Sequence, residues 1–280
     1  MKNINDNFKK NLNSINQSER KIIERIKSLY KIFYIVRNSH VIYLSFRDEE
    51  IPSFPEGILD LPYLETIYIG QNKIRHIPDS IDSLKYLRDL TIRHNKLKSL
   101  PISIGNLYNL ETLSLVANDI EVLPESILKL ENLKTLALTG NKIETIDQKI
   151  SKLTKLEELF LSDNLIKIIP DSITSLKNLK QLWIKENQLE KIPQNIGDLT
   201  NLVELNIADN NIESIPKSIG NLKNLMLLGL SGNKIKNLPK SLYNLKKLIN
   251  LNLDVYKRTP KLENWLVLLE SKNNCDIHLS

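Results

Sequence analysis

The sequence predicts an α/β solenoid, a chain that stacks one short repeated unit along a parallel β-sheet. Asparagine recurs at intervals of 23 residues, eight times from Asn72 to Asn233. The residues five and three before each asparagine are apolar and their neighbours are mostly polar, which is the alternation of a half-buried strand. Parallel strands need a crossover of about a dozen residues, and the remainder of each unit supplies it. Because one unit cannot bury its own apolar face, the core forms only between neighbours.

The unit, written from Leu84, is "LKYLRDLTIRHNKLKSLPISIGN", or LxxLxxLxIxxNxLxxLPxxIxx. This pattern resembles the leucine-rich repeat family, in the 23-residue variety of Ras-suppressor-like proteins, plant intracellular Ras-group proteins and bacterial repeat proteins. The resemblance covers residues 41 to about 258. It implies a right-handed superhelix, or horseshoe, with a concave parallel β-sheet and an irregular or 3-10 convex side. It also implies binding of proteins on the concave sheet.

The recurring asparagine predicts a structural ladder inside the stack. The backbone must turn just after each strand, and a buried unpaired backbone group costs about 1 to 3 kcal/mol. An asparagine side chain offers both a donor and an acceptor, and in the family resembled here a column of asparagines bonds the turns around it. The ladder comprises Asn72, Asn95, Asn118, Asn141, Asn164, Asn187, Asn210 and Asn233.

Proline follows six residues after seven of these asparagines, and Asp147 replaces it once. Its fixed dihedral and missing donor suit the turn into the return path.

Three segments are expected along the chain: a basic helical N-terminal cap at 1–40, about ten repeats at 41–258, and a helix–strand cap at 259–280. Apolar residues at helical spacing predict a helix over 18–37, with Ser18 as its N-cap. The first and last repeats are degenerate, since Glu49 and Tyr256 stand where asparagine belongs. Pro260 marks the start of a short helix, and the final residues "CDIHLS" read as a strand.

Composition and motifs argue against catalysis and against a membrane span. The chain is 41% hydrophobic and 26% charged, and no stretch approaches the roughly 20 apolar residues of a span. We expect no catalytic residue, no metal and no cofactor, because the histidines lack metal-site spacing and no phosphate-binding or nucleophile motif occurs. Cys275, the one cysteine, is expected to be a buried cap residue. No secretory signal is recognised at the start, so we expect a cytoplasmic protein, with leaderless secretion left open.

The net charge of +6 resides in the first 40 residues, which hold nine Lys or Arg and three Asp or Glu. The repeats are neutral. A basic head could bind nucleic acid or an anionic membrane, although a solvated, lysine-rich cap is the simpler interpretation. Binding that phosphates drive would weaken steeply with salt.

The positions six, four, two and one before each asparagine face outward on the sheet and form columns about 4.8 Å apart. Phe160 and Trp183 are neighbours in one column, where they either cover each other or form the centre of a binding patch. Asp163, Glu186 and Asp209 form an acidic column. The candidate partner-binding residues are Tyr68, Arg93, His94, Glu158, Phe160, Asp163, Gln181, Trp183, Lys185, Glu186, Glu204, Asn206 and Asp209.

These residues predict a non-enzymatic protein-interaction module, acting as a monomer in a scaffolding or signalling role. The expected partner is a protein or peptide that presents basic and apolar groups, rather than a nucleic acid. One alternative is a secreted bacterial effector or adhesion factor that acts on a host protein. The other is binding of an anionic membrane or nucleic acid through the basic N-terminal cap.

Overall fold

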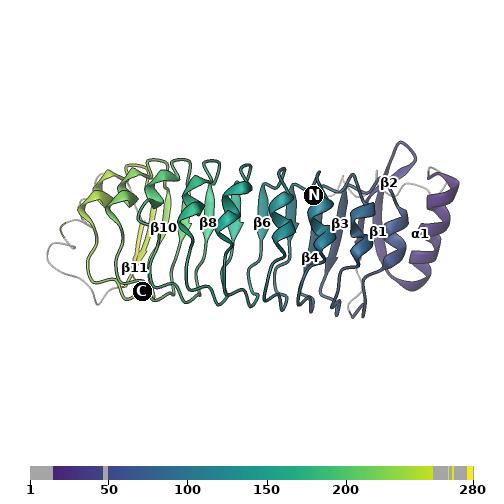
Figure 1. Ribbon diagram of the computed structural model, residues 1–280, viewed down its shortest axis with the longest axis horizontal. Helices are drawn as coiled ribbons and strands as arrows, with labels where there is room; N and C mark the ends of the chain where they lie inside the picture. The colour runs from purple at the N-terminus through teal and green to yellow at the C-terminus, as the bar shows by residue number, and fades with distance from the viewer. Residues whose placement is uncertain (1–14, 47–49, 255–263, 265–266, 268–275, 280) are drawn as a thin grey trace. The chain divides into compact units, whose positions relative to one another are not determined.

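The computed structural model describes residues 15–46, 50–254, 264, 267 and 276–279. The chain forms two compact units, Met1–Leu133 and Lys134–Ser280. Within each unit one strand and one short helical turn recur per repeat (Figure 1). The predicted repeat solenoid, with parallel strands and 3-10 turns on the return path, is confirmed.

Unit 1 begins with helix α1 (Gln17–Leu29), and its first two strands form an antiparallel hairpin. From the second strand onward the neighbours pair in parallel. The strands are β1 (Ile32–Arg37), β2 (His40–Phe46), β3 (Thr66–Gly70), β4 (Asp89–Arg93) and β5 (Thr112–Ser114). The 3-10 helices are η2 (Glu56–Asp60), η3 (Asp79–Ser83), η4 (Ile102–Asn106) and η5 (Glu125–Lys129).

The N-terminal helix is shorter than the sequence predicts, because the expected helix over 18–37 ends at Leu29 and Ile32–Arg37 is a strand. The N-cap is also wrong: Asn16, not Ser18, accepts the hydrogen bond from the Glu19 amide, at 3.0 Å. Asn38 and Ser39 both adopt positive φ, which is the geometry of a tight hairpin turn. Residues 32–37 therefore gain strand partners in β2 that a helix would forgo.

The described residues of unit 2 form seven strands, each paired in parallel with the next. They are β6 (Thr135–Ala137), β7 (Glu158–Phe160), β8 (Gln181–Trp183), β9 (Glu204–Asn206), β10 (Leu227–Gly229), β11 (Asn250–Leu253) and β12 (Asp276–Leu279). The 3-10 helices are η6 (Gln148–Lys152), η7 (Asp171–Ser175), η8 (Ile196–Asp198), η9 (Lys217–Asn221) and η10 (Lys240–Asn244).

The predicted final strand is β12, which pairs in parallel with β11. The predicted C-terminal helix falls almost wholly outside the described residues. Glu49, Tyr256 and Cys275 also lie outside the described residues.

The recurring proline directly precedes each 3-10 helix that follows it, except that Pro193 stands three residues before η8. Pro78, for example, precedes η3 with φ −68° and ψ 151°, an extended conformation that its ring already favours. Asp147 takes the same place before η6, and its carboxylate accepts a hydrogen bond from the Lys149 amide at 2.7 Å. A side-chain cap at this position thus replaces the fixed backbone of proline.

All eight repeated asparagines are buried, with 3% to 9% of their surface exposed. Asn210 illustrates their bonds: its Oδ1 accepts from the Leu189 amide at 2.9 Å, and its Nδ2 donates to the Ile184 carbonyl at 2.9 Å. Both partners belong to the preceding repeat, so each side chain joins two turns of the stack. The same two bonds recur at Asn95, Asn118, Asn164, Asn187 and Asn233.

A second set of asparagines bonds the repeats on the return side, and the sequence analysis missed it. Each donates from Nδ2 to the backbone carbonyl 24 residues earlier, as Asn178 does to Thr154 at 2.8 Å. Its members are Asn109, Asn132, Asn178, Asn201 and Asn224. The motif "LxNL" carries the signal for it.

A row of charges with alternating sign runs along the residues that precede the strands. In this charge row acid and base alternate from one repeat to the next at Glu65, Arg88, Glu111, Lys134, Glu157 and Lys180. Arg88 contacts Glu111 at 2.9 Å and Lys180 contacts Glu157 at 2.5 Å. Such exposed pairs contribute about 0.2 to 1 kcal/mol each.

Candidate functional site

The open sheet face of unit 2, the side of its strands that points away from the leucine core, carries the two large aromatics that the sequence singles out. Phe160 in β7 pairs directly with Trp183 in β8. Their rings meet edge to face, with centroids 5.6 Å apart and planes at 83°. Both side chains are half-buried, while Leu159 and Leu182 beside them are buried in the core. The rings thus cover each other in part and leave the rest of their surface to solvent.

Acidic and amide side chains surround this aromatic pair. The Trp183 indole Nε1 donates to Glu204 Oε2 at 3.0 Å, which fixes the orientation of the ring. Glu158 accepts a hydrogen bond from the Thr135 hydroxyl at 2.9 Å. Asn206 accepts from the Ala208 amide at 3.2 Å, and Gln181 is half-buried. The Trp183 ring is thereby held by a carboxylate of the following repeat, while Glu158 bonds back to the preceding repeat.

The acidic column consists of Asp163, Glu186 and Asp209, all exposed. Each stands directly before a ladder asparagine and has φ of 53° to 54°, in the left-handed region. Gly140 and Gly232 occupy the same position in other repeats, also at positive φ. Glycine and aspartate tolerate this conformation better than most residues, so they were the available signal that the predicted turn after each strand is left-handed.

Lys185 lies within the acidic column and is paired with one of its members. Its Nζ contacts Glu186 Oε1 at 2.6 Å. This hydrogen bond raises the pKa of Lys185 above its ordinary value; burial opposes the effect, and the charges of Glu186, Asp209 and Asp163 add to it. The ammonium group therefore pairs with Glu186 and lies in the field of the other two carboxylates.

The other three candidate residues lie in unit 1 and form a separate group. Arg93 Nη2 donates to the Tyr68 hydroxyl at 2.9 Å, and the guanidinium lies 5.3 Å from the centre of the Tyr68 ring. His94 is exposed at φ 52°. The structure also adds a residue that the sequence analysis missed: Asp89 accepts a hydrogen bond from the Thr91 hydroxyl at 2.8 Å. The sequence could have indicated Asp89, because it stands six residues before the ladder residue Asn95, as Glu158 stands six residues before Asn164 in unit 2.

We expect Asp89→Asn to stabilise the protein at neutral pH. Burial raises the pKa of the Asp89 carboxyl above its ordinary 3.8, against the hydrogen bond from Thr91 and the charge of Arg93. The folded state then holds the proton more tightly than the unfolded state, so the contribution of Asp89 is fully present below pH 3.8 and is lost as pH rises through the raised pKa.

The measurement is the difference in unfolding free energy between Asp89→Asn and the wild type from pH 3 to pH 7. We expect the variant's advantage to grow with pH. A difference that stays constant across this range would contradict the argument.

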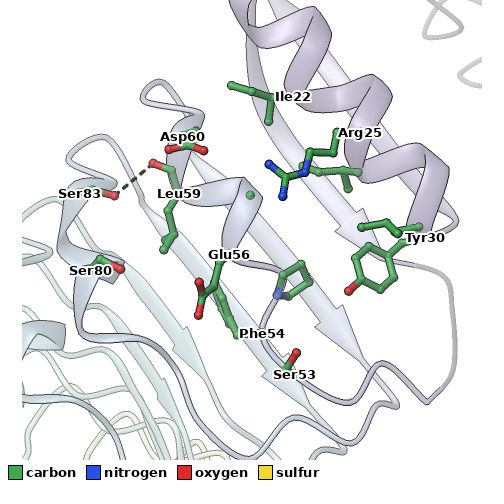
Figure 2. Close-up of a pocket in the computed structure, with 14 residues that line it drawn as sticks. Ile22, Arg25, Tyr30, Ser53, Phe54, Glu56, Leu59, Asp60, Ser80 and Ser83 are labelled. Atoms are coloured by element: carbon green, nitrogen blue, oxygen red, sulfur yellow. Dashed lines mark hydrogen bonds between the residues drawn. The ribbon is translucent and has the colours of Figure 1, made fainter.

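A groove in unit 1 lies between α1 and the turns η2 and η3 (Figure 2). Its volume is about 670 Å³. Arg25 projects from α1, while Glu56 and Asp60 belong to η2. Charges of both signs line the groove, so its electrostatics favour no particular ligand.

Other kinds of site receive no support from the described part of the chain. No group of three or more His, Cys, Asp or Glu side chains there could hold a metal ion. Nor does any helix in the described ranges combine the length and apolar character that a membrane span requires. Two cations of the basic N-terminal segment are paired, Arg20 with Glu24 at 3.1 Å and Arg37 with Glu65 at 3.0 Å.

Comparison with known proteins gives family matches over most of the repeats. A family model described as "Leucine-rich repeat region" matches residues 79–165 and 194–273. A second, "Leucine Rich repeats (2 copies)", matches residues 154–197. No curated protein matches by sequence.

Several solved structures share the fold. The Arabidopsis receptor kinase HAESA, in complex with the peptide hormone IDA and a co-receptor, is 28% identical over 79% of this chain and 40% of that chain, with a TM-score of 0.69. A TDR receptor is 27% identical over 72% of this chain and 37% of that chain, with a TM-score of 0.66. An internalin from Listeria monocytogenes is 22% identical over 81% and 72%, with a TM-score of 0.62, and shows the fold alone.

The chain spans about two fifths of the plant receptor chains that it matches. The family models cover more than half of its residues, and the repeats of β3 to β10 share one strand, one buried asparagine and one return turn. The protein belongs to the leucine-rich repeat family.

Proposed function

We propose that this protein is a non-enzymatic interaction module that binds a protein or peptide on the open sheet face of unit 2. The observation that carries the proposal is the Phe160–Trp183 pair. These two large aromatics lie on the side of the sheet away from its core and bury each other only in part, and such residues are enriched at the energetic centres of protein interfaces. Among the structural neighbours, HAESA is solved with a peptide hormone, and PEPR1 is solved together with AtPEP1, at 25% identity to this chain and a TM-score of 0.61.

The carboxylates around the pair indicate the charge of the partner. Asp163, Glu186 and Asp209 are exposed, and Glu204 touches Trp183. Lys185 offsets only part of this charge. A partner that presents basic groups next to apolar ones therefore complements the surface.

We expect Trp183→Ala and Phe160→Ala each to weaken partner binding by about 2 kcal/mol or more, which is roughly thirtyfold in Kd. Flat aromatic side chains at the centre of an interface exclude water, whereas truncation of either ring to alanine leaves a water-filled space beneath the partner. The measurement begins with a displayed random-peptide library selected on the wild-type chain. Surface plasmon resonance then compares the selected peptides on each variant.

Lys152→Ala serves as the matched control, because Lys152 is exposed on the return turn η6 of the same unit. It should leave the affinity unchanged. Loss of binding with Lys152→Ala, together with full binding by Trp183→Ala, would move the site to the return side of the repeats and overturn the proposal.

A further inference from the structure

The row of carboxylates in unit 2 already contains a cation of its own. Asp163, Glu186 and Asp209 occupy the same position in three consecutive repeats, so their backbone sites are stacked one strand spacing apart, about 4.8 Å. The Lys185 ammonium contacts Glu186 at 2.6 Å and is close enough to Asp163 and Asp209 for their charges to raise its pKa. The column is thus arranged around a positive charge, and one residue of the chain supplies it.

The aromatic pair borders this charge. Trp183 is the last residue of β8, and Lys185 follows it with only the buried Ile184 between them. The hydrogen bond to Glu204 and the edge-to-face contact with Phe160 hold the indole in place. A planar cation seated beside Lys185 would therefore meet a fixed aromatic surface.

Ser162 provides an independent sign of unmet bonding capacity at the same place. It follows Phe160 by two residues, just beyond the end of β7, and its position in the next repeat is that of Lys185. Only 3% of Ser162 is exposed, and its Oγ has no hydrogen-bond partner among the described residues. A buried hydroxyl without a partner is unfavourable, and a donor from a ligand would satisfy it.

We propose that Phe160, Ser162, Asp163, Trp183 and Glu186 form a subsite for an arginine side chain of the partner, and that Lys185 holds the place of its guanidinium until the partner arrives. The proposal rests on the function proposed above. A guanidinium fits better than an ammonium because its flat face stacks on an aromatic ring while its N–H groups bond carboxylates and a hydroxyl.

Displacement of Lys185 is physically easy. The side chains of Lys185 and Glu186 are 40% and 48% exposed, so their ion pair is weak and water can replace either partner. The lysine stem is flexible and carries the ammonium into solvent. Lys185 is therefore an internal competitor, and its removal should strengthen binding of arginine.

The test uses three short peptides, acetyl-Gly-Leu-X-Leu-Gly-amide, in which X is arginine, lysine or citrulline. Citrulline keeps the shape of arginine without its charge. Trp183 and Trp265 are the two tryptophans of the chain. In the full-length Trp265→Phe chain, indole fluorescence reports Trp183 alone and gives the Kd for each peptide.

We expect the arginine peptide to bind at least tenfold more tightly than the citrulline peptide, and more tightly than the lysine peptide. Adding Lys185→Met should strengthen arginine binding about threefold or more and leave citrulline binding unchanged. Lys185→Gln should act like Lys185→Met, and circular dichroism checks that both variants remain folded. Lys152→Met, on the return side, should change neither affinity.

Equal binding of arginine and citrulline, equal binding of arginine and lysine, or weaker arginine binding after Lys185→Met would each overturn the arginine subsite. If Trp183→Ala still weakened binding of the library peptides, the proposed function would hold without the arginine subsite. If surface plasmon resonance shows that the library peptides and the arginine peptide both bind Trp183→Ala as tightly as wild type, both proposals fail.

Discussion

Leu182→Ala should destabilise the protein by about 2 to 5 kcal/mol, the loss that follows when a buried leucine leaves a cavity in a packed core. Leu182 is 0% exposed. It pairs in register with Leu159 of β7 and Leu205 of β9, so one truncation removes contacts to the repeats on both sides. Urea denaturation followed by circular dichroism measures the effect.

Gln181→Ala is the matched control for this experiment. Gln181 precedes Leu182 in the same strand and is half-buried on the open sheet face, so its truncation should cost less than about 1 kcal/mol. A larger loss from Gln181→Ala than from Leu182→Ala would mean that the strand faces the other way. Trp183 would then belong to the core, and the proposed binding face on the open side of the sheet would be wrong.

Asn210→Ala should cost about 1 to 3 kcal/mol, the second largest effect expected. Alanine would leave the buried Leu189 amide without its acceptor. It would also remove the donor that serves the carbonyls of Ile184, Ile207 and Ala208. Water cannot reach these groups to compensate, because Asn210 is only 6% exposed.

Asn211→Ala provides the comparison, since Asn211 is the next residue and lies outside the ladder register. Its replacement should change the denaturation midpoint little. Hydrogen exchange of the Leu189 amide gives a local reading of the same effect, with faster exchange expected in Asn210→Ala only. Equal midpoints for the two variants would contradict a structural role for the ladder.

The repeat made most of the fold predictable, because period and alternation act at every unit. The N-terminal end lacked this support. Apolar residues over 18–37 suit a helix by spacing, yet "IFYIVR" at 32–37 is rich in β-branched and aromatic residues. Residues 32–37 form a strand instead of a helix because the Asn38–Ser39 turn lets them pair with β2. This partner is a tertiary contact that helical spacing alone does not reveal.

For the candidate site, the sequence predicted which residues share a face but not how their side chains meet. The stacking of Phe160 and Trp183 follows from the 23-residue period. The bond from Trp183 to Glu204, the pairing of Lys185 with Glu186, and the unpartnered hydroxyl of Ser162 depend on side-chain rotamers. Rotamers respond to local packing, which the repeat pattern does not specify.

The charge row constrains how a chain of this kind can grow or shrink. Its signs alternate from one repeat to the next, so loss of a single unit such as 73–95, which contains Arg88, would set Glu65 against Glu111. Like charges on neighbouring strands repel, whereas loss of two adjacent units would keep opposite signs together. Along this stretch, therefore, deleting or duplicating a pair of repeats keeps opposite charges adjacent, whereas changing the length by one 23-residue repeat forfeits the small contribution of an exposed pair.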